Sequence, residues 1–312
     1  MNIALKQLRV FVAVAQEKTV TAAAERLFLT KPAVSMALAE LEKQLGQPLF
    51  DRHHNRLTLN SEGRRLLPLA DELLHRTQSI AQLFQRRGPL TGHLAIGSSD
   101  TVGNQLTPFL LRDFRTQTAH TDQSLLIGNT AGIVEKLCDF ELDIGLVEGR
   151  ISEKHLISQP WLQDEMVIIC HPEHPLLNQP ALTFSDLSGT DWVLRESGSG
   201  TRDYFLNHLA PELQSWQLAF ELNTTESILN SVAAGLGMTC LSRRATAHAV
   251  RDCRVAELPL HLPKPRQYWL AYHKDKYSSP LLAAFIDFCL RWRPGSDPIV
   301  PATERNDLTD LT

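Results

Sequence analysis

The chain has 312 residues, of which 43% are hydrophobic and 21% are charged. This is enough sequence to bury the cores of two ordinary domains, and the composition excludes a disordered polymer. No apolar stretch approaches the ~20 residues of a membrane-spanning helix. The first ten residues include Lys6 and Arg9, which interrupt the apolar core that a signal peptide needs.

The five cysteines are scattered along the chain and never form a Cys-x-x-Cys pair. An odd set without close pairs argues against a disulfide framework and against a zinc ribbon. We therefore expect reduced thiols in a cytoplasmic protein that does not contact membranes. We also expect no metal and no other cofactor.

The net charge of −4 is unevenly distributed along the chain. Residues 1–91 carry 13 Lys and Arg against 8 Asp and Glu, whereas the remainder carries 18 against 27. A basic front and an acidic body indicate that the first part meets a polyanion while the second part has another task.

The first sixty residues have the pattern of a helix-turn-helix. Apolar residues three and four apart predict an amphipathic helix from Leu5 to Ala15, and a short helix fits Val20 to Leu27. Thr30 is placed to cap a third helix, with Pro32 in its first turn and Gly46 at its end. A small-residue helix, a tight turn and a capped helix are typical of a DNA-binding unit.

The segment from Pro48 to Leu59 predicts a short basic hairpin, which is typical of a wing beside a recognition helix. The alternative is a plain three-helix bundle whose arginines lie on a solvated face. On the DNA-binding interpretation, the candidate contact residues are Thr30, Lys31, Pro32, Ser35, Arg52 and Arg56.

Residues 30–35 (Thr-Lys-Pro-Ala-Val-Ser) and 41–52 (Leu-Glu-x-x-Leu-Gly-x-x-Leu-Phe-x-Arg) resemble the LysR-type transcriptional regulators, and the match extends over residues 3–65. The family's usual Ser-Gln is Thr30-Lys31 here, and its usual Thr-x-Ala-Gly is Asn-Ser-Glu-Gly at 60–63. Lys31 cannot make the paired contact of glutamine with adenine, but it suits phosphate or guanine. The resemblance implies promoter DNA as a partner, with RNA polymerase as a further candidate.

Residues 61–88 predict a linker helix with an apolar heptad seam, kinked near its start by Pro68. The helix could pack on the chain's own body, but in the resembled family it pairs two subunits. The resemblance thus implies a homo-oligomer, a dimer through the linker helix or a tetramer. The seam residues are Leu66, Ala70, Leu73, Thr77, Ile80 and Phe84.

Beyond a hinge at residues 88–92, short apolar runs alternate with helical stretches, which predicts βαβ units and a mostly parallel sheet in two α/β lobes. The expected strands are 93–98, 123–128, 143–148, 165–171, 191–195, 219–223, 238–242, 255–260 and 267–273.

The resemblance implies that this body is a periplasmic-binding-protein-like effector domain whose chain crosses twice between lobes. We place the crossings near Pro160-Trp161 and near Pro263 to Pro265. The predicted parts are a winged helix-turn-helix at 1–60, a linker helix at 61–88, and an effector domain at 92–293. Within the last, lobe I is 92–160 plus 267–293 and lobe II is 161–266, with a disordered tail at 294–312.

Polar and small residues follow several of these strands, where helix N-termini of both lobes would face a cleft. Each stretch alone fits ordinary caps and turns, but their recurrence in both lobes favours a small anionic effector. The candidate effector-binding residues are Ser98, Ser99, Thr101, Asn129, Thr130, Glu148, Arg195, Ser199, Gly200 and Thr201.

These segments look most like the branch of the family that senses sulfur oxyanions such as sulfite. Glu148 would repel a dianion, so a protonated or singly charged oxyanion, or a carboxylate ligand with an amine, fits better. Two alternatives remain: a solute-binding module without DNA binding, and an α/β enzyme that uses Glu148 or Glu196. Because no nucleophile–base set emerges from the spacing, we predict a regulator and not an enzyme.

Overall fold

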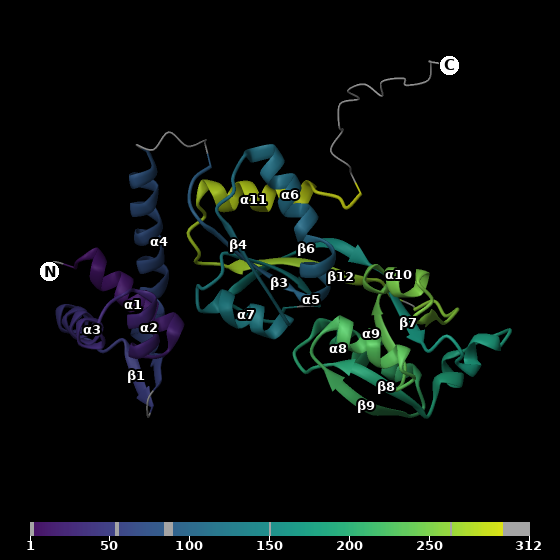
Figure 1. Cartoon of the computed structure of the whole chain (residues 1–312). Coiled ribbons are helices and arrows are strands. Elements are labelled where there is room, and N and C mark those ends of the chain that lie inside the picture. Colours follow the sequence, from purple (N-terminus) through teal and green to yellow (C-terminus); the bar gives the residue numbers. More distant parts are fainter. Residues whose placement is uncertain (1–2, 54–55, 84–89, 150, 263, 296–312) are drawn as a thin grey trace, which may run out of the picture.

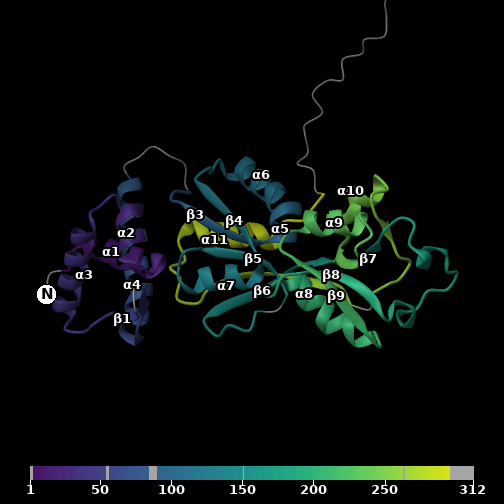
Figure 2. The ribbon, with the colours of Figure 1, turned by 60° about the horizontal axis from the view of Figure 1, so that its bottom comes forward.

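The computed structural model describes residues 3–53, 56–83, 90–149, 151–262 and 264–295. Three bodies follow one another along the chain: a winged helix with a long helix, and two α/β lobes (Figure 1). Figure 2 shows them in a row, with lobe I in the middle. The predicted tail beyond residue 295 and Phe84 of the predicted seam lie outside the described residues.

The winged helix has the predicted order of elements. Thr19 caps the second helix and Thr30 caps the third, each accepting a hydrogen bond from a backbone N–H three residues later. Gly46 ends the third helix in the left-handed region, at φ 71°. The elements are α1 (Leu5–Glu17), α2 (Val20–Arg26), α3 (Lys31–Leu45), β1 (Phe50–His53) and β2 (Arg56–Leu59).

The linker helix α4 (Ser61–Leu83) runs through Pro68 and does not present the predicted seam on one free face. Ala70 is fully buried in the winged-helix core and Leu66 packs against that core, whereas Leu73 and Ile80 are 49% and 59% exposed. The prediction that the whole heptad seam forms one interface with a second subunit is wrong, because α1 of the same chain packs against the first half of α4.

Lobe I is built on a five-stranded sheet of order β4-β3-β5-β12-β6. Helices α6 and α11 cover one face and α7 covers the other (Figure 1). The strands are β3 (Leu94–Ser99), β4 (Gln123–Gly128), β5 (Ile144–Glu148), β6 (Leu156–Asp164) and β12 (Arg266–His273). The helices are α5 (Asp100–Gln105), α6 (Thr107–Thr118), α7 (Thr130–Cys138) and α11 (Pro280–Arg291).

Lobe II has two small sheets, of order β10-β7-β11 and β8-β9. The strands are β7 (Met166–Cys170), β8 (Thr190–Arg195), β9 (Trp216–Leu222), β10 (Thr239–Ser242) and β11 (Ala256–Glu257). The helices are α8 (Gly200–Tyr204), α9 (Thr225–Ala233) and α10 (Arg243–Arg251), and short helical turns lie at Pro175–Asn178, Phe184–Leu187, Phe205–Leu209 and Ala210–Glu212.

The sheets are mixed and not mostly parallel as predicted. β3 pairs in parallel with β4 and β5, and β8 with β9. The pairs of β12 with β5 and β6, and those of β7 with β10 and β11, are antiparallel. In lobe I the prediction was wrong because β12 returns from lobe II and enters the sheet in the opposite direction. In lobe II it was wrong because β10 and β11 both run antiparallel to β7.

The first crossing between lobes also differs from the prediction. β6 continues in the lobe I sheet to Asp164, so the chain enters lobe II at Glu165 and not near Pro160-Trp161. β6 is an edge strand, where a proline such as Pro160 is tolerated because one side of the strand needs no hydrogen-bond partner. The proline marked an apparent boundary inside a strand that sequence patterning did not predict.

The winged helix docks against lobe I. Phe140 lies in a left-handed turn after α7, and its ring is buried in the winged-helix core. Gln16 Nε2 donates to the Phe140 carbonyl at 2.9 Å. Lys276, before α11, contacts Asp71 of α4 and Asp143 of lobe I. The first domain is thereby held to lobe I by both packing and charge. Among the described residues, no helix is long and apolar enough to cross a membrane.

Candidate DNA-binding face and effector cleft

The start of α3 lies on the surface of the winged helix. Thr30 is its N-cap and accepts from the Ala33 N–H at 3.4 Å, so its hydroxyl already has a structural task. Lys31, Pro32 and Ser35 are exposed. The positive end of the helix dipole and one ammonium group therefore face solvent together, an arrangement that suits phosphate.

The wing carries two of the predicted arginines. Arg52 on β1 and Arg56 on β2 are exposed, on strands that pair antiparallel. The Leu57 N–H donates to the Lys18 carbonyl at 2.8 Å, which fixes the hairpin to the end of α1. The structure thus presents the wing and the start of α3 from one compact core.

The two lobes meet tightly at the ends of their strands. A Cβ atom on Gly200 would lie 2.6 Å from the Glu148 carbonyl oxygen, so only glycine allows α8 to approach β5 this closely. The Ala131 N–H of lobe I donates to the Gly198 carbonyl of lobe II at 3.0 Å. The cleft is closed by direct backbone contact.

Glu148 occupies the place where an anion was predicted. Its carboxylate accepts from the Thr101 N–H at 3.0 Å, from the Thr201 hydroxyl at 2.9 Å and from Arg266 at 2.9 Å. Burial raises the pKa of Glu148, but the Arg266 charge and these hydrogen bonds outweigh it and hold the pKa below its ordinary value. Glu148 is therefore ionised and acts as an internal anion.

Arg266 begins β12, where the chain returns from lobe II to lobe I, and it contacts residues of both lobes. It contacts Asp164 at the end of β6 as well as Glu148, and its Nη1 donates to Thr201 at 2.8 Å. Burial lowers the pKa of Arg266, but the two carboxylates outweigh burial and raise it. Ser242 of lobe II donates to the second oxygen of Asp164 at 2.9 Å. This charge cluster was missed, because no local pattern marks Arg266 or Asp164 as neighbours.

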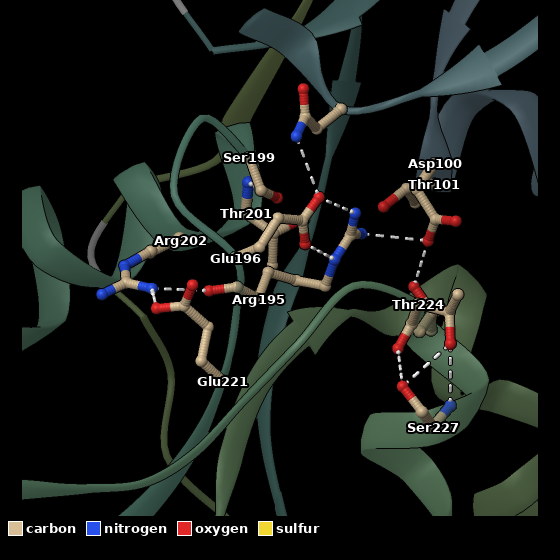
Figure 3. A network of polar contacts seen from close by, with 12 residues as sticks. Asp100, Thr101, Arg195, Glu196, Ser199, Thr201, Arg202, Glu221, Thr224 and Ser227 are labelled. Carbon is tan, nitrogen blue, oxygen red and sulfur yellow. Dashed lines mark hydrogen bonds and ion pairs between the residues drawn. The ribbon is translucent and has the colours of Figure 1, made fainter. Parts of the chain in front are cut away.

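Arg195 forms a second buried charge group, which also crosses the cleft (Figure 3). Its guanidinium donates twice to Glu196, at 2.8 and 3.0 Å, and its Nη1 lies 3.1 Å from an Asp100 oxygen. Asp100 in turn accepts from Thr225 of α9, and Asn129 donates to Glu196. The role of Asp100 as a bridge between lobes was not predicted.

Two buried polar groups in this region have no hydrogen-bond partner among the described residues. The Ser99 hydroxyl is one, and its side chain is 2% exposed. The other is Arg195 Nη1, which is close to Asp100 but not in hydrogen-bonding geometry. Buried unsatisfied polar groups are costly, so a hydrogen bond to either atom would be stabilising.

Other predicted effector-binding residues have structural partners. The Ser98 hydroxyl points into lobe I, toward Thr107 and the Leu146 carbonyl. Asn129 and Ser199 accept hydrogen bonds as N-caps of α7 and α8. The Thr130 hydroxyl donates to the Glu148 carbonyl at 3.0 Å. The structure brings these residues to the cleft wall, but their polar atoms are partly occupied by the chain itself.

The cysteines are free. Burial raises the pKa of Cys138 and Cys170 to about 11 and that of Cys240 to about 12, which disfavours thiolate chemistry at these three. Within the described ranges, no three His, Cys, Asp or Glu side chains are grouped to hold a metal ion.

Comparison with protein families now identifies the chain. A model described as bacterial regulatory helix-turn-helix protein, lysR family, matches residues 5–64, and one described as LysR substrate binding domain matches residues 87–294. The chain belongs to the LysR family. This LysR-type protein is a DNA-binding transcriptional regulator with an effector-binding domain, as its winged helix and two-lobe body predicted.

Individual relatives agree with this assignment. The chain is 38% identical over 290 residues to the uncharacterized HTH-type transcriptional regulator YeiE of Escherichia coli K12, covering 93% of this chain and 98% of the relative. It is 32% identical over 237 residues to the regulator CysL of Bacillus subtilis, covering 76% and 79%. These relatives are named as regulators, so the enzyme and the isolated solute-binding module are wrong for this LysR-type chain.

A solved structure supports the fold over the whole length. A full-length OxyR variant from Pseudomonas aeruginosa superposes with a TM-score of 0.71 at 23% identity, covering 93% of this chain and 94% of that one. The predicted fold class, an N-terminal winged helix-turn-helix followed by a two-lobe α/β domain, is confirmed for this LysR-type regulator.

Proposed function

We propose that this LysR-type regulator binds promoter DNA in the cytoplasm as a homo-oligomer and that a small oxyanion of the sulfite class, bound between the lobes, changes its DNA contacts. The observation that carries the effector proposal is a pair of buried donors without a hydrogen bond among the described residues, the Ser99 hydroxyl and Arg195 Nη1, although Nη1 is paired by charge with Asp100. They belong to different lobes, so one ligand that accepts from both would favour one lobe arrangement.

The charges around these donors limit which anion is acceptable. The two buried groups contain four carboxylates (Asp100, Glu148, Asp164 and Glu196) and only the two guanidinium groups of Arg195 and Arg266. A dianion would meet net negative charge, whereas a protonated oxyanion or a ligand with its own amine would meet less repulsion. This favours hydrogen sulfite over sulfate.

Thermal unfolding of the full chain with sulfite, sulfate, acetate or glycine tests the effector proposal. At 100 times its Kd, a specific ligand adds ~2.7 kcal/mol of stability. We expect sulfite to raise the unfolding temperature more than sulfate. Ser99→Ala and Arg195→Gln should reduce that rise while leaving DNA binding intact. A rise with glycine alone would replace sulfite by a ligand with an amine. No rise with any of the four contradicts the proposed site.

The proposed DNA contacts are Thr30, Lys31, Pro32 and Ser35 from α3, with Arg52 and Arg56 from the wing. Lys31→Ala should weaken binding to duplex DNA and reduce its salt dependence, because one phosphate contact is lost. The matched control is Lys154→Ala, which removes an exposed lysine of lobe I. Equal affinities of the two variants would contradict the assignment of α3.

The exposed part of α4 supports the proposal of a dimer. Leu69, Leu73 and Ile80 are 59%, 49% and 59% exposed at spacings of four and seven, as expected of a helix that pairs with a second copy. Light scattering should show that Leu73→Glu with Ile80→Glu lowers the molar mass. An unchanged mass would mean that other surfaces form the oligomer. A tetramer and contact with RNA polymerase stay predictions.

A further inference from the structure

The outward face of the recognition helix α3 carries a stripe that is apolar except at its last residue. The opposite face is buried by Val34, Leu38 and Leu41. At 100° per residue, the positions farthest from this buried face lie at i, i+4, i+7 and i+11, and all of them are exposed. These positions are Pro32, Met36, Ala39 and Lys43.

Met36 is the one large apolar side chain of this stripe, and 72% of it is exposed. A single exposed methionine on an ordinary surface needs no explanation. This one lies in the middle of the face that enters the major groove if α3 reads DNA as proposed. Phe28 is more exposed, at 95%, but it lies in the turn before α3 and outside the stripe.

The apolar part of the stripe, Pro32, Met36 and Ala39, cannot read bases by paired hydrogen bonds. Such contacts come from arginine, lysine, asparagine or glutamine, and in the stripe only Lys43, at its far end, is of these types. Beside the stripe, Gln44 donates to Glu40 at 3.1 Å, which engages both side chains with each other. The feature of the major groove that an apolar side chain recognises is the C5 methyl group of thymine.

We infer that Met36, flanked by Pro32 and Ala39, is a specificity-determining residue that contacts thymine methyl groups in each half-site. The inference rests on the proposed placement of α3 in the major groove. Charge supports DNA as the occupant, because the exposed ammonium groups of Lys31 and Lys43 lie toward the two ends of α3, while the exposed Glu40 carboxylate beside the stripe accepts from Gln44. The unbranched thioether of Met36 can adapt its shape to a methyl-rich groove.

Removing only the methyl groups tests this inference. Duplexes bound by the full chain are first selected from a random library, and each thymine of the best duplex is then replaced by deoxyuridine. Burial of one methyl group corresponds to about a fourfold difference in Kd. For the natural sequence, we expect replacement by deoxyuridine to weaken binding by this factor at one or two thymines of each half-site. Met36→Gln should bind the thymine and deoxyuridine duplexes with equal affinity, whereas Met36→Leu should still prefer the thymine duplex.

Lys43→Ala is the matched control, because Lys43 lies on the same stripe and is also exposed. It should weaken both duplexes equally and reduce the salt slope by about 1, with the thymine preference unchanged. The exposure of Met36 predicts unchanged melting temperatures for its variants. A thymine preference that persists in Met36→Gln overturns the inference, as does its absence in the natural sequence. Failure to bind any duplex would overturn the proposed DNA face as well.

Discussion

Two buried cations, each between two carboxylates, hold this regulator together at different places. Arg266 bridges Glu148 and Asp164 where the lobes meet, whereas Lys276 bridges Asp71 of the linker helix and Asp143 of lobe I. Their side chains are 2% and 3% exposed. One cluster closes the effector domain, and the other attaches the DNA-binding domain to it.

The two clusters differ in how completely the cation is bound. The fork of Arg266 also donates to Thr201 and to the Tyr268 hydroxyl, so partners on both lobes surround it. Lys276 is a point charge 3.2 Å from Asp71 and 2.9 Å from Asp143. A cavity of about 920 Å³ between the domains is lined by its neighbours Lys274 and Asp275. The comparison indicates that the lobes form the firmer contact and that the domain junction separates more readily.

The largest effect is expected from Arg266→Met. The substitution leaves Glu148 and Asp164 buried without their cation, which costs about 3–5 kcal/mol in comparable cases. Chemical denaturation followed by tryptophan fluorescence measures the loss in the free energy of unfolding of the lobes. Arg266→Lys keeps the positive charge but loses the planar guanidinium, so its free energy of unfolding should lie between those of the natural protein and Arg266→Met. A loss below about 1 kcal/mol for Arg266→Met would make this cluster no stronger than the domain junction and break the comparison.

Lys276→Met should have a smaller effect. It should weaken the association of the DNA-binding domain with lobe I by about 1–3 kcal/mol, because Asp71 regains water when the two domains separate. The expected sign is an increased radius of gyration in small-angle X-ray scattering, with the unfolding of the lobes little changed. Lys274→Met is the control, since Lys274 is exposed two residues away. If the lobes are destabilised as strongly as by Arg266→Met, the junction is not the weaker contact.

Acid should loosen the junction. Burial raises the pKa of Asp71, but His75 and the charge of Lys276 outweigh it and hold the pKa below its ordinary value. A carboxyl group whose pKa is lower in the folded than in the unfolded state stabilises the folded state at pH values above its unfolded pKa, which is near 4. This stabilisation is lost as the pH falls through the lower pKa of the folded state. The radius of gyration should therefore rise below about pH 4. Asp71→Asn should flatten this pH dependence. If the radius of gyration of the variant rises as steeply with acid, a group other than Asp71 is responsible.

The smallest effect is expected from Lys18→Ala at the edge of the same junction. Lys18 contacts Glu135 at 2.7 Å and Asp139 at 3.0 Å, but its side chain is 38% exposed. Exposed ion pairs contribute about 0–1 kcal/mol and are screened by salt. The scattering profile should change little, and any change should vanish at 1 M salt. A change as large as that of Lys276→Met would show that burial does not separate the two contacts.

Local signals determined much of the DNA-binding domain. Thr30, Pro32 and Gly46 mark the ends of α3 because caps and left-handed turns are properties of a few neighbouring residues. The match of residues 30–52 to the family added the function. The exposure of Met36 was not predicted, although the spacing of Val34, Leu38 and Leu41 could have placed it opposite the core.

The effector cleft was predicted in outline only. The predicted residues Thr101 and Thr201 do meet at the Glu148 carboxylate, because β3 and β5 are parallel neighbours and α8 approaches them from lobe II. The sequence did not predict that the Glu148 carboxylate accepts hydrogen bonds from Thr101 and Thr201, because these residues are 47 and 53 positions away from it in the chain.

The sequence by itself therefore determined the elements whose causes are local: caps, helix faces, most strands and the family. Only the tertiary structure decided which side of α4 is buried, that β6 belongs to lobe I, and that Arg266 lies between Glu148 and Asp164. The physical reason is that a buried charge finds its partner through the path of the whole chain, and residues more than a hundred positions apart leave no shared pattern in the sequence.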